Sequence, residues 1–226
     1  MAAGILQAPP QPPVLRRTNG RVPPPPPRTG GGGDPDREPP TPRRPLDNLR
    51  LAIVFFIGAE TMFFAALISA LFVLRLGMAV WPPPLQPRLP VGITGLNTLV
   101  LLASSVVMIA AGRALARDDR RGLVRRLGLA ALLGAVFLVV QGYEWARLVS
   151  FGLTMSSSTY GTTFYTLIGT HAVHVLGALI WLCVTALLAA GGRFSRERGS
   201  AVRACAMYWH FVVGLWPFLY VAVYLL

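Results

Sequence analysis

Five long apolar segments constrain the fold of this chain more than any other feature of its sequence. Each is near or above the roughly 20 residues that a helix needs to cross the hydrocarbon core of a bilayer. They lie at about residues 51–74, 91–111, 127–148, 161–190 and 204–226. Since a backbone surrounded by lipid must satisfy its own hydrogen bonds, segments of this kind are helical. The sequence therefore predicts an all-α fold, an integral membrane bundle of five transmembrane helices within residues 48–226.

Residues 1–47 have a different composition. They contain 14 of the 20 prolines and a run of four glycines, and almost no large apolar side chains. Such a segment buries too little surface to offset the entropy lost on ordering, so we expect a disordered tail. It has no apolar core of the kind found in a signal peptide. A proline motif that docks on another protein remains an alternative interpretation of the tail.

The basic residues indicate how the bundle is oriented. All 21 are arginines, set against nine acidic residues. They lie between the apolar segments, which is typical of a membrane protein and does not indicate a nucleic-acid partner. Residues 1–50 and the second and fourth loops between segments hold 18 of them, and the opposite side holds three, Arg75, Arg88 and Arg147. This bias predicts a multi-pass protein of the bacterial plasma membrane, with a cytoplasmic N-terminus and a periplasmic or extracellular C-terminus.

Ionisable side chains within the apolar segments are the candidate functional residues. Glu60 lies ten residues after Arg50, which places it about 15 Å into the membrane at the rise of an α-helix. His171 lies ten residues after the outer end of the fourth segment, at the same predicted depth. An unpaired charge at this depth is costly, so we expect Glu60 to face the bundle interior and to pair with His171 or His174.

Two further ionisable residues lie elsewhere in the bundle. Glu144 should lie near the outer interface, where water, Tyr143 and Arg147 could satisfy its carboxylate. His210 should lie about two turns into the last segment from the cytoplasmic side.

The residues alone leave three interpretations open. They are ligation of heme or a metal, a proton path, and a hydrogen-bonded cluster that fixes helix packing or holds something polar. Heme ligation needs imidazoles from facing helices, whereas His171 and His174 share one helix face. We expect a cluster, with small residues beside it that allow close helix approach, namely Gly169, Ala172, Gly177 and Ala178. The two cysteines, Cys183 and Cys205, should be buried thiols.

Four stretches of the sequence resemble subunit III of the heme–copper respiratory oxidases, in its five-helix form. They are FFIGAETMFFAALISALF, LNTLVLLASS, QGYEWARLVSFGLTMSSSTYGTTFYTLIGTHAVHVLGALI and YWHFVVGLWPFLYVAVYLL. They occur in the order of the family's helices and cover most of residues 50–226, whereas the N-terminal tail lies outside the resemblance.

The resemblance implies an accessory subunit that is not catalytic by itself. Its complex would be a proton-translocating cytochrome c or quinol oxidase of aerobic respiration and the electron transport chain. Heme and copper would lie in partner subunits, since this chain has three histidines and a catalytic subunit needs six. Its partners would be subunit I, which is catalytic, subunit II and membrane lipids. It would support proton uptake and the stability of subunit I, and it would hold phospholipid.

By position, the resemblance implies roles for six residues in lipid binding or a buried polar cluster, and none in catalysis or metal binding. They are Arg50, Glu60, Glu144, His171, His174 and His210. Arg50 would contact a lipid headgroup.

Two departures from the family pattern have consequences. Val213 occupies the usual position of an acidic residue, so any role of that acid is absent or moved. Seven-helix members of the family have two earlier helices that close a lipid cleft, and we do not expect residues 1–47 to form them. The resemblance then implies a cleft that is open or is completed by another subunit. A homologue associated with nitric-oxide reductase, a stand-alone ion transporter and a heme-binding redox protein are the alternatives to a cytochrome c or quinol oxidase subunit.

Overall fold

The computed structural model describes residues 48–81 and 91–226. Within these ranges the chain forms five long α-helices followed by one π-helical turn, with no strand. The helices are α1 (Asn48–Leu76), α2 (Val91–Ala116), α3 (Arg120–Ser150), α4 (Thr159–Ala190) and α5 (Ser200–Tyr220), and the π-helix is η1 (Val221–Leu225). All five α-helical regions are long and apolar enough to span a bilayer. The predicted fold class is confirmed, whereas the tail of residues 1–47 lies outside the described residues.

The helices extend beyond the apolar segments into the flanking loops. α3, for example, begins at Arg120, seven residues before the apolar segment predicted to start at 127. It starts there because the side chain of Asp119 accepts a hydrogen bond from the backbone N–H of Gly122 at 2.8 Å, which caps the first turn. Ser158 caps α4 in the same way through Gly161, at 3.1 Å. Polar capping residues, and not hydropathy, therefore decide where these helices begin.

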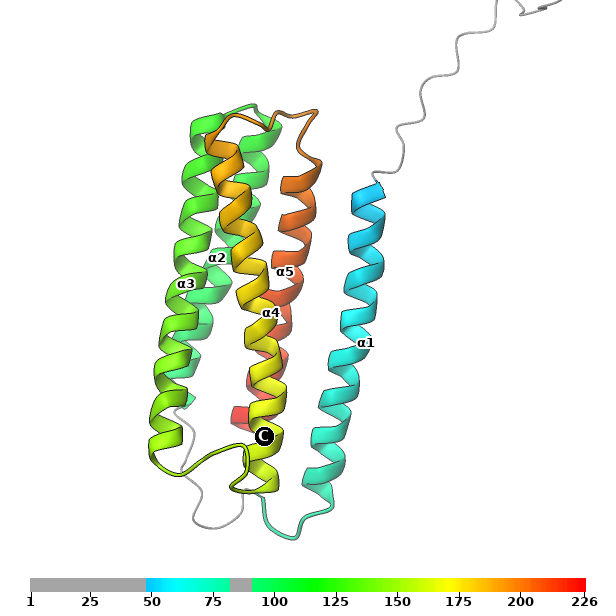
Figure 1. Ribbon diagram of the computed structural model, residues 1–226, viewed down its shortest axis with the longest axis vertical. Helices are drawn as coiled ribbons and strands as arrows, with labels where there is room; N and C mark the ends of the chain where they lie inside the picture. The colour runs from blue at the N-terminus through cyan, green and yellow to red at the C-terminus, as the bar shows by residue number, and fades with distance from the viewer. Residues whose placement is uncertain (1–47, 82–90) are drawn as a thin grey trace, which may run out of the picture. The chain divides into compact units, whose positions relative to one another are not determined.

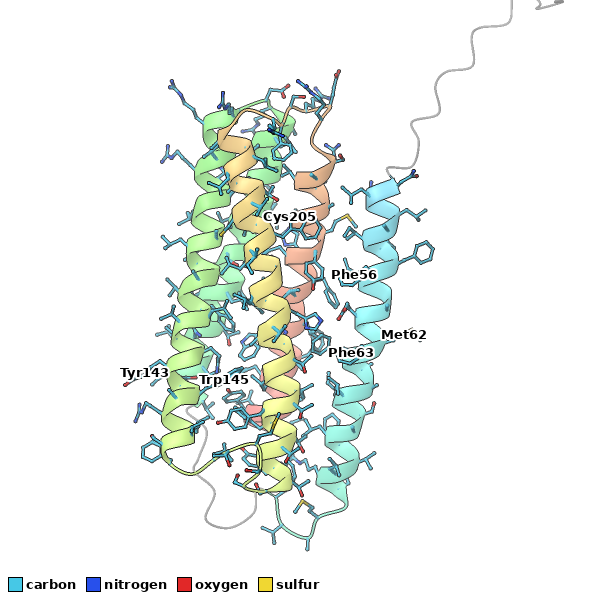
Figure 2. The ribbon with its side chains drawn as sticks, viewed as in Figure 1. Phe56, Met62, Phe63, Tyr143, Trp145 and Cys205 are labelled. Carbon is cyan, nitrogen blue, oxygen red and sulfur yellow. The ribbon has the colours of Figure 1, made fainter. Side chains whose placement is uncertain are left out.

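Helices α2 to α5 pack side by side, and α1 lies along α4 and α5 (Figure 1). Few α1 side chains are buried; Phe64 and Leu71 are the two that reach the core. The centre of the bundle is filled by large side chains from α3, α4 and α5, among them Phe137, Phe164 and Trp209. α1 therefore presents most of its apolar surface outward, as Figure 2 shows for Met62.

One close approach between helices depends on a glycine. A Cβ at Gly134 on α3 would lie 2.5 Å from the indole of Trp209 on α5. The small residues expected from the sequence to have this role behave otherwise. A Cβ at Gly169 or Gly177 would meet nothing within 4 Å, although Ala178 is buried. The difference arises because those two glycines face away from the neighbouring helices.

Two arginine-rich loops are held together at one end of the bundle. The backbone N–H of Arg196, between α4 and α5, donates a 2.6 Å hydrogen bond to the side chain of Asp118, between α2 and α3. Arg120 donates to the carbonyl of Ala190 at the end of α4. Asp118 has a φ of +53°, which aspartate tolerates better than most residues. The two arginine-rich loops therefore lie at the same end of the bundle.

Candidate functional site

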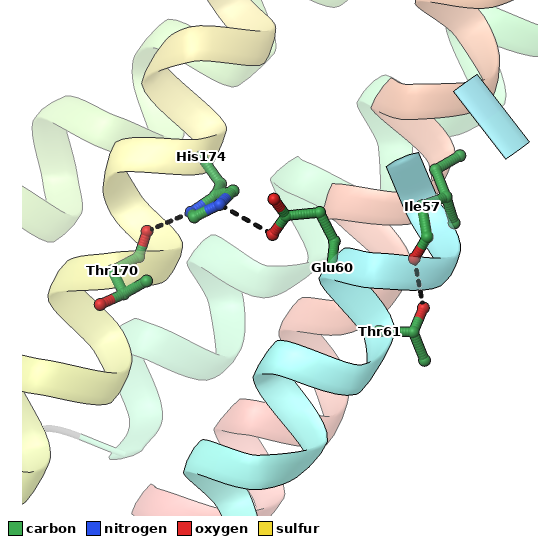
Figure 3. Close-up of polar contacts among 5 residues, drawn as sticks. All are labelled: Ile57, Glu60, Thr61, Thr170 and His174. Atoms are coloured by element: carbon green, nitrogen blue, oxygen red, sulfur yellow. Dashed lines mark hydrogen bonds and ion pairs between the residues drawn. The ribbon is translucent and has the colours of Figure 1, made fainter. Parts of the chain in front are cut away.

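The central polar contact joins α1 to α4. Oε2 of Glu60 lies 2.9 Å from Nε2 of His174, as Figure 3 shows. Both side chains are mostly enclosed. On the other side of the imidazole ring, Nδ1 of His174 lies 2.7 Å from the backbone carbonyl oxygen of Thr170. The partner of Glu60 is thus His174, and not its neighbour His171.

The contact with Thr170 fixes which nitrogen of His174 is the donor. A carbonyl oxygen can only accept, so Nδ1 of His174 carries a hydrogen, and in a neutral ring Nε2 is then an acceptor. Oε2 of Glu60 lies 2.9 Å from Nε2, without the geometry of a hydrogen bond. A membrane interior tolerates such a pair best in a form without net charge.

Aromatic rings surround this pair. The ring of Phe64 meets the imidazole of His174 edge-on, with centroids 5.1 Å apart, and meets that of His171 in the same way at 6.1 Å. Phe63 lies beside His174 at 6.4 Å. These apolar neighbours exclude water from one side of the contact and strengthen its electrostatic attraction.

His171 has a different environment from His174. It is 1% exposed, and its ring stacks on the indole of Trp216 with centroids 5.2 Å apart. Neither ring nitrogen has a hydrogen-bond partner among the described residues. An imidazole buried in this way must be neutral to avoid an unpaired charge. His171 therefore acts as a flat packing surface between Phe64 and Trp216.

Glu144 does not lie in the environment that the sequence suggested. It is 4% exposed, and its Oε2 accepts from the hydroxyl of Thr94 at 2.8 Å and from the amide of Gln141 at 3.4 Å. Tyr143, one expected partner, is 65% exposed, because adjacent residues on a helix point about 100° apart. The expected partner Arg147 stacks over aromatic rings instead.

The remaining predicted site residues lie apart from the Glu60–His174 pair. Nδ1 of His210 on α5 is 2.5 Å from the hydroxyl of Ser105 on α2. Arg50 is exposed on the first turn of α1. Val213, at the usual acidic position of the family, is buried in the apolar core at 1% exposure. Of the two cysteines, Cys205 is buried as expected, whereas Cys183 is exposed, because its position on α4 faces outward.

The stretch LNTLVLLASS was part of the family resemblance, but sequence reasoning assigned no contacts to the polar face of α2. Thr98 accepts from the indole of Trp216 at 2.8 Å, Ser104 accepts from that of Trp209 at 3.2 Å, and Asn97 donates to the carbonyl of Phe137 at 3.0 Å. These residues recur at helical spacing between apolar ones. This spacing was the available signal, since buried tryptophans need acceptors for their N–H groups.

The part of the chain that the structure describes brings no three His, Cys, Asp or Glu side chains together in a way that could hold a metal ion. The three histidines have different partners: His174 lies beside Glu60, His210 lies beside Ser105, and His171 stacks on Trp216. The site is a carboxyl–imidazole pair inside a multi-pass helical membrane bundle.

Comparison with known proteins agrees with this architecture. The family model described as cytochrome c oxidase subunit III matches residues 44–226. Cytochrome c oxidase subunit 3 of Synechocystis sp. is 36% identical over 181 residues, which cover 79% of this chain and 76% of that protein. The Corynebacterium diphtheriae protein of the same name is 35% identical and covers 76% and 84% respectively. That of Paracentrotus lividus is 34% identical and covers 79% and 69%.

A match over most of the chain, together with five spanning helices, defines the class as a multi-pass membrane protein. The chain belongs to the cytochrome c oxidase subunit III family.

Proposed function

We propose that this chain is the accessory subunit III of a heme–copper terminal oxidase and forms a hetero-oligomeric complex with the catalytic subunit I and with subunit II. The observation that carries the proposal is the family match over residues 44–226. In this proposal heme and copper belong to the partner subunits, and this chain supports their proton uptake and stability. The contact of Glu60 on α1 with His174 on α4, which joins two helices, supports a scaffold role.

The proposed complex lies in a bacterial plasma membrane, with the N-terminus in the cytoplasm and the C-terminus outside. The bonds that join the loop after α2 to the loop after α4 support this orientation. They place ten arginines of the two loop regions, residues 113–126 and 193–203, at one end of the bundle, and such clusters stay on the cytoplasmic side.

Bound phospholipid is the second part of the proposal. The outward face of α1 is apolar, with Phe55 and Met62 among its most exposed side chains. Arg50 is exposed where α1 begins, at the level where a cationic side chain meets a lipid phosphate. An acyl chain along α1 would cover this face, with the headgroup at Arg50.

The test is to purify the oxidase from cells with and without this chain. We expect the complex without it to lose phospholipid and to inactivate after fewer turnovers, and its heme-to-protein ratio to change. The proposal fails if lipid content, inactivation and heme ratio are all unchanged.

Two controls separate this role from the alternatives. An Arg50→Gln variant should lower the lipid content and leave the subunit in the complex, since Arg50 is exposed on the first turn of α1. The isolated chain in liposomes should not dissipate a pH gradient. A flux that disappears in Glu60→Gln would instead identify a stand-alone transporter.

A further inference from the structure

A second buried polar cluster lies away from the Glu60–His174 pair and contains Thr94 on α2, Gln141 and Glu144 on α3, and Tyr224 on η1. The amide nitrogen of Gln141 lies 3.2 Å from the hydroxyl of Tyr224 and 3.4 Å from Oε2 of Glu144. Thr94 donates to that same Oε2 at 2.8 Å. The cluster thus joins three segments of the chain.

Two oxygens of the cluster lack partners. Oε1 of Glu144 and Oε1 of Gln141 are both buried, and neither has a hydrogen-bond partner among the described residues. An ionised carboxylate and an amide oxygen are both acceptors, so they cannot satisfy each other. A protonated carboxyl, however, can donate. The amide N–H of Gln141 already bonds Oε2 of Glu144. The two unpartnered oxygens are therefore the remaining oxygens of the same two side chains.

We infer that Glu144 is a proton-binding site: a proton on its Oε1 is donated to Oε1 of Gln141, and the two side chains form a neutral acid–amide pair. Carboxylate and proton combine to a carboxylic acid, and no other bond changes. The pair then has two reciprocal hydrogen bonds, and both buried oxygens are satisfied.

The charges around Glu144 support this inference. Its only neighbouring cation on α3, Arg147, directs its guanidinium over the rings of Tyr143 and Phe151, at 6.0 and 5.9 Å. The described residues contain no ion pair to Glu144. The other titratable groups near the cluster are the phenols of Tyr224 on η1 and Tyr160 on α4. An ionised Glu144 would therefore be a buried charge with no ion pair among the described residues, offset only by the more distant charge of Arg147, which is unfavourable.

The backbone at the end of α5 explains how the third segment reaches this pair. Pro217 lacks the N–H that would continue the α-helical ladder, and the chain widens into a π-helix at Val221–Leu225. This change of twist places Tyr224 against Gln141. The acid–amide pair therefore holds the C-terminal turn against α2 and α3 without a net charge.

Infrared difference spectroscopy on the purified complex that contains this chain tests the inference. Subtracting the spectrum of Glu144→Gln at neutral pH should reveal a carboxylic-acid C=O band of the native protein. That band should persist but shift to higher frequency in Gln141→Leu, because the acid loses its acceptor, and should be unchanged in Glu60→Gln. The inference would be overturned if the difference spectrum showed carboxylate bands of Glu144 in place of the acid band, or if the acid band did not shift in Gln141→Leu.

Assembly provides a second measurement. Glu144→Gln should assemble and resist heat as the native chain does, since its amide can still donate to Gln141 and accept from Thr94, whereas Glu144→Ala should be less stable. Failure of Glu144→Gln to assemble would show that the ionised form is needed and would also overturn the inference. Neither measurement involves oxidase turnover, so the result is independent of the proposed function.

Discussion

At the scale of single residues, the environment of each histidine determines what it does. His174 has a carbonyl on one nitrogen and a carboxyl on the other. His171, three residues earlier on the same helix, stacks on Trp216 and has an edge-on contact with Phe64. The imidazole that contacts a carboxyl can share a proton, whereas the one between aromatic rings contributes packing.

The Glu60–His174 pair yields a prediction about stability. Removing the imidazole in His174→Ala leaves the Glu60 carboxyl without its partner, and we expect a loss of about 1–3 kcal/mol. Glu60→Gln should cost less, because its amide N–H can still donate to Nε2 of His174. The measurement is thermal inactivation of the purified complex for both variants.

The opposite ranking would contradict this prediction. If Glu60→Gln were the more damaging change, the pair would require a carboxylate beside an imidazolium. His171→Phe is a matched control, because a ring of similar shape should keep the stack on Trp216.

The indole of Trp216 yields a second prediction at this scale. Its N–H donates to Thr98 across the α2–α5 interface at 2.8 Å. Trp216→Phe and Thr98→Val should each destabilise the chain, with a coupling of about 0.5–1.5 kcal/mol in a double-mutant cycle of unfolding. Additive effects of the two changes would show that the hydrogen bond contributes nothing measurable.

At the scale of helices, a single position sets how closely α3 approaches α5. Trp209 is fully buried, and its ring end lies where a Cβ at Gly134 would be. The rigid indole cannot move away, since its N–H is bonded to Ser104 on α2. α1 packs mainly on α5 and α4.

We therefore expect Gly134→Ala to force α3 and α5 apart, at a cost of about 1–3 kcal/mol, typical of overpacking. Gly128→Ala, on the same helix, is the matched control, because a Cβ there would meet nothing within 4 Å. Unfolding of both variants in detergent measures the difference. Equal stability of the two would show that the helices adjust freely.

At the scale of the whole molecule, the loops at one end form a connected surface. Asp118 and Arg120 beside the α2–α3 turn bond to the segment that links α4 and α5. Because helices alternate in direction, the connection between α3 and α4 lies at the opposite end (Figure 1). The molecule thus has an arginine-rich end and an arginine-poor end.

This asymmetry predicts which side of the membrane each loop faces. In a chain with Cys183→Ala and Cys205→Ala, cysteines introduced at Arg117 and Arg193 should react with an impermeant thiol reagent only from the cytoplasm. A cysteine at Ser156 should react only from outside. Labelling of intact cells against inverted vesicles measures this. Reaction of the Arg117 and Ser156 variants from the same side would contradict the fold itself.

The elements were predictable from the sequence, and the contacts at the site were predictable only in part. Hydropathy located all five helices, since a spanning helix is a local property of about 20 residues. Predicted depth along the helices placed Glu60 and His171 at one level, with His174 one turn further along, but it could not choose between His171 and His174 as the partner of Glu60. That choice depends on the rotation of α4 about its axis, which packing against Phe64 and Trp216 decides.

By itself, the sequence determined that this chain is a five-helix membrane bundle with a few ionisable groups at mid-depth, because length, hydropathy and arginine distribution act locally along the chain. Only the tertiary structure decided that Glu60 meets His174, that Glu144 turns inward to Thr94 and Gln141, and that Gly134 receives Trp209. Apart from that of Glu144 with Gln141 on its own helix, these contacts join residues far apart in the chain. They follow from how side chains of different helices fill one shared interior.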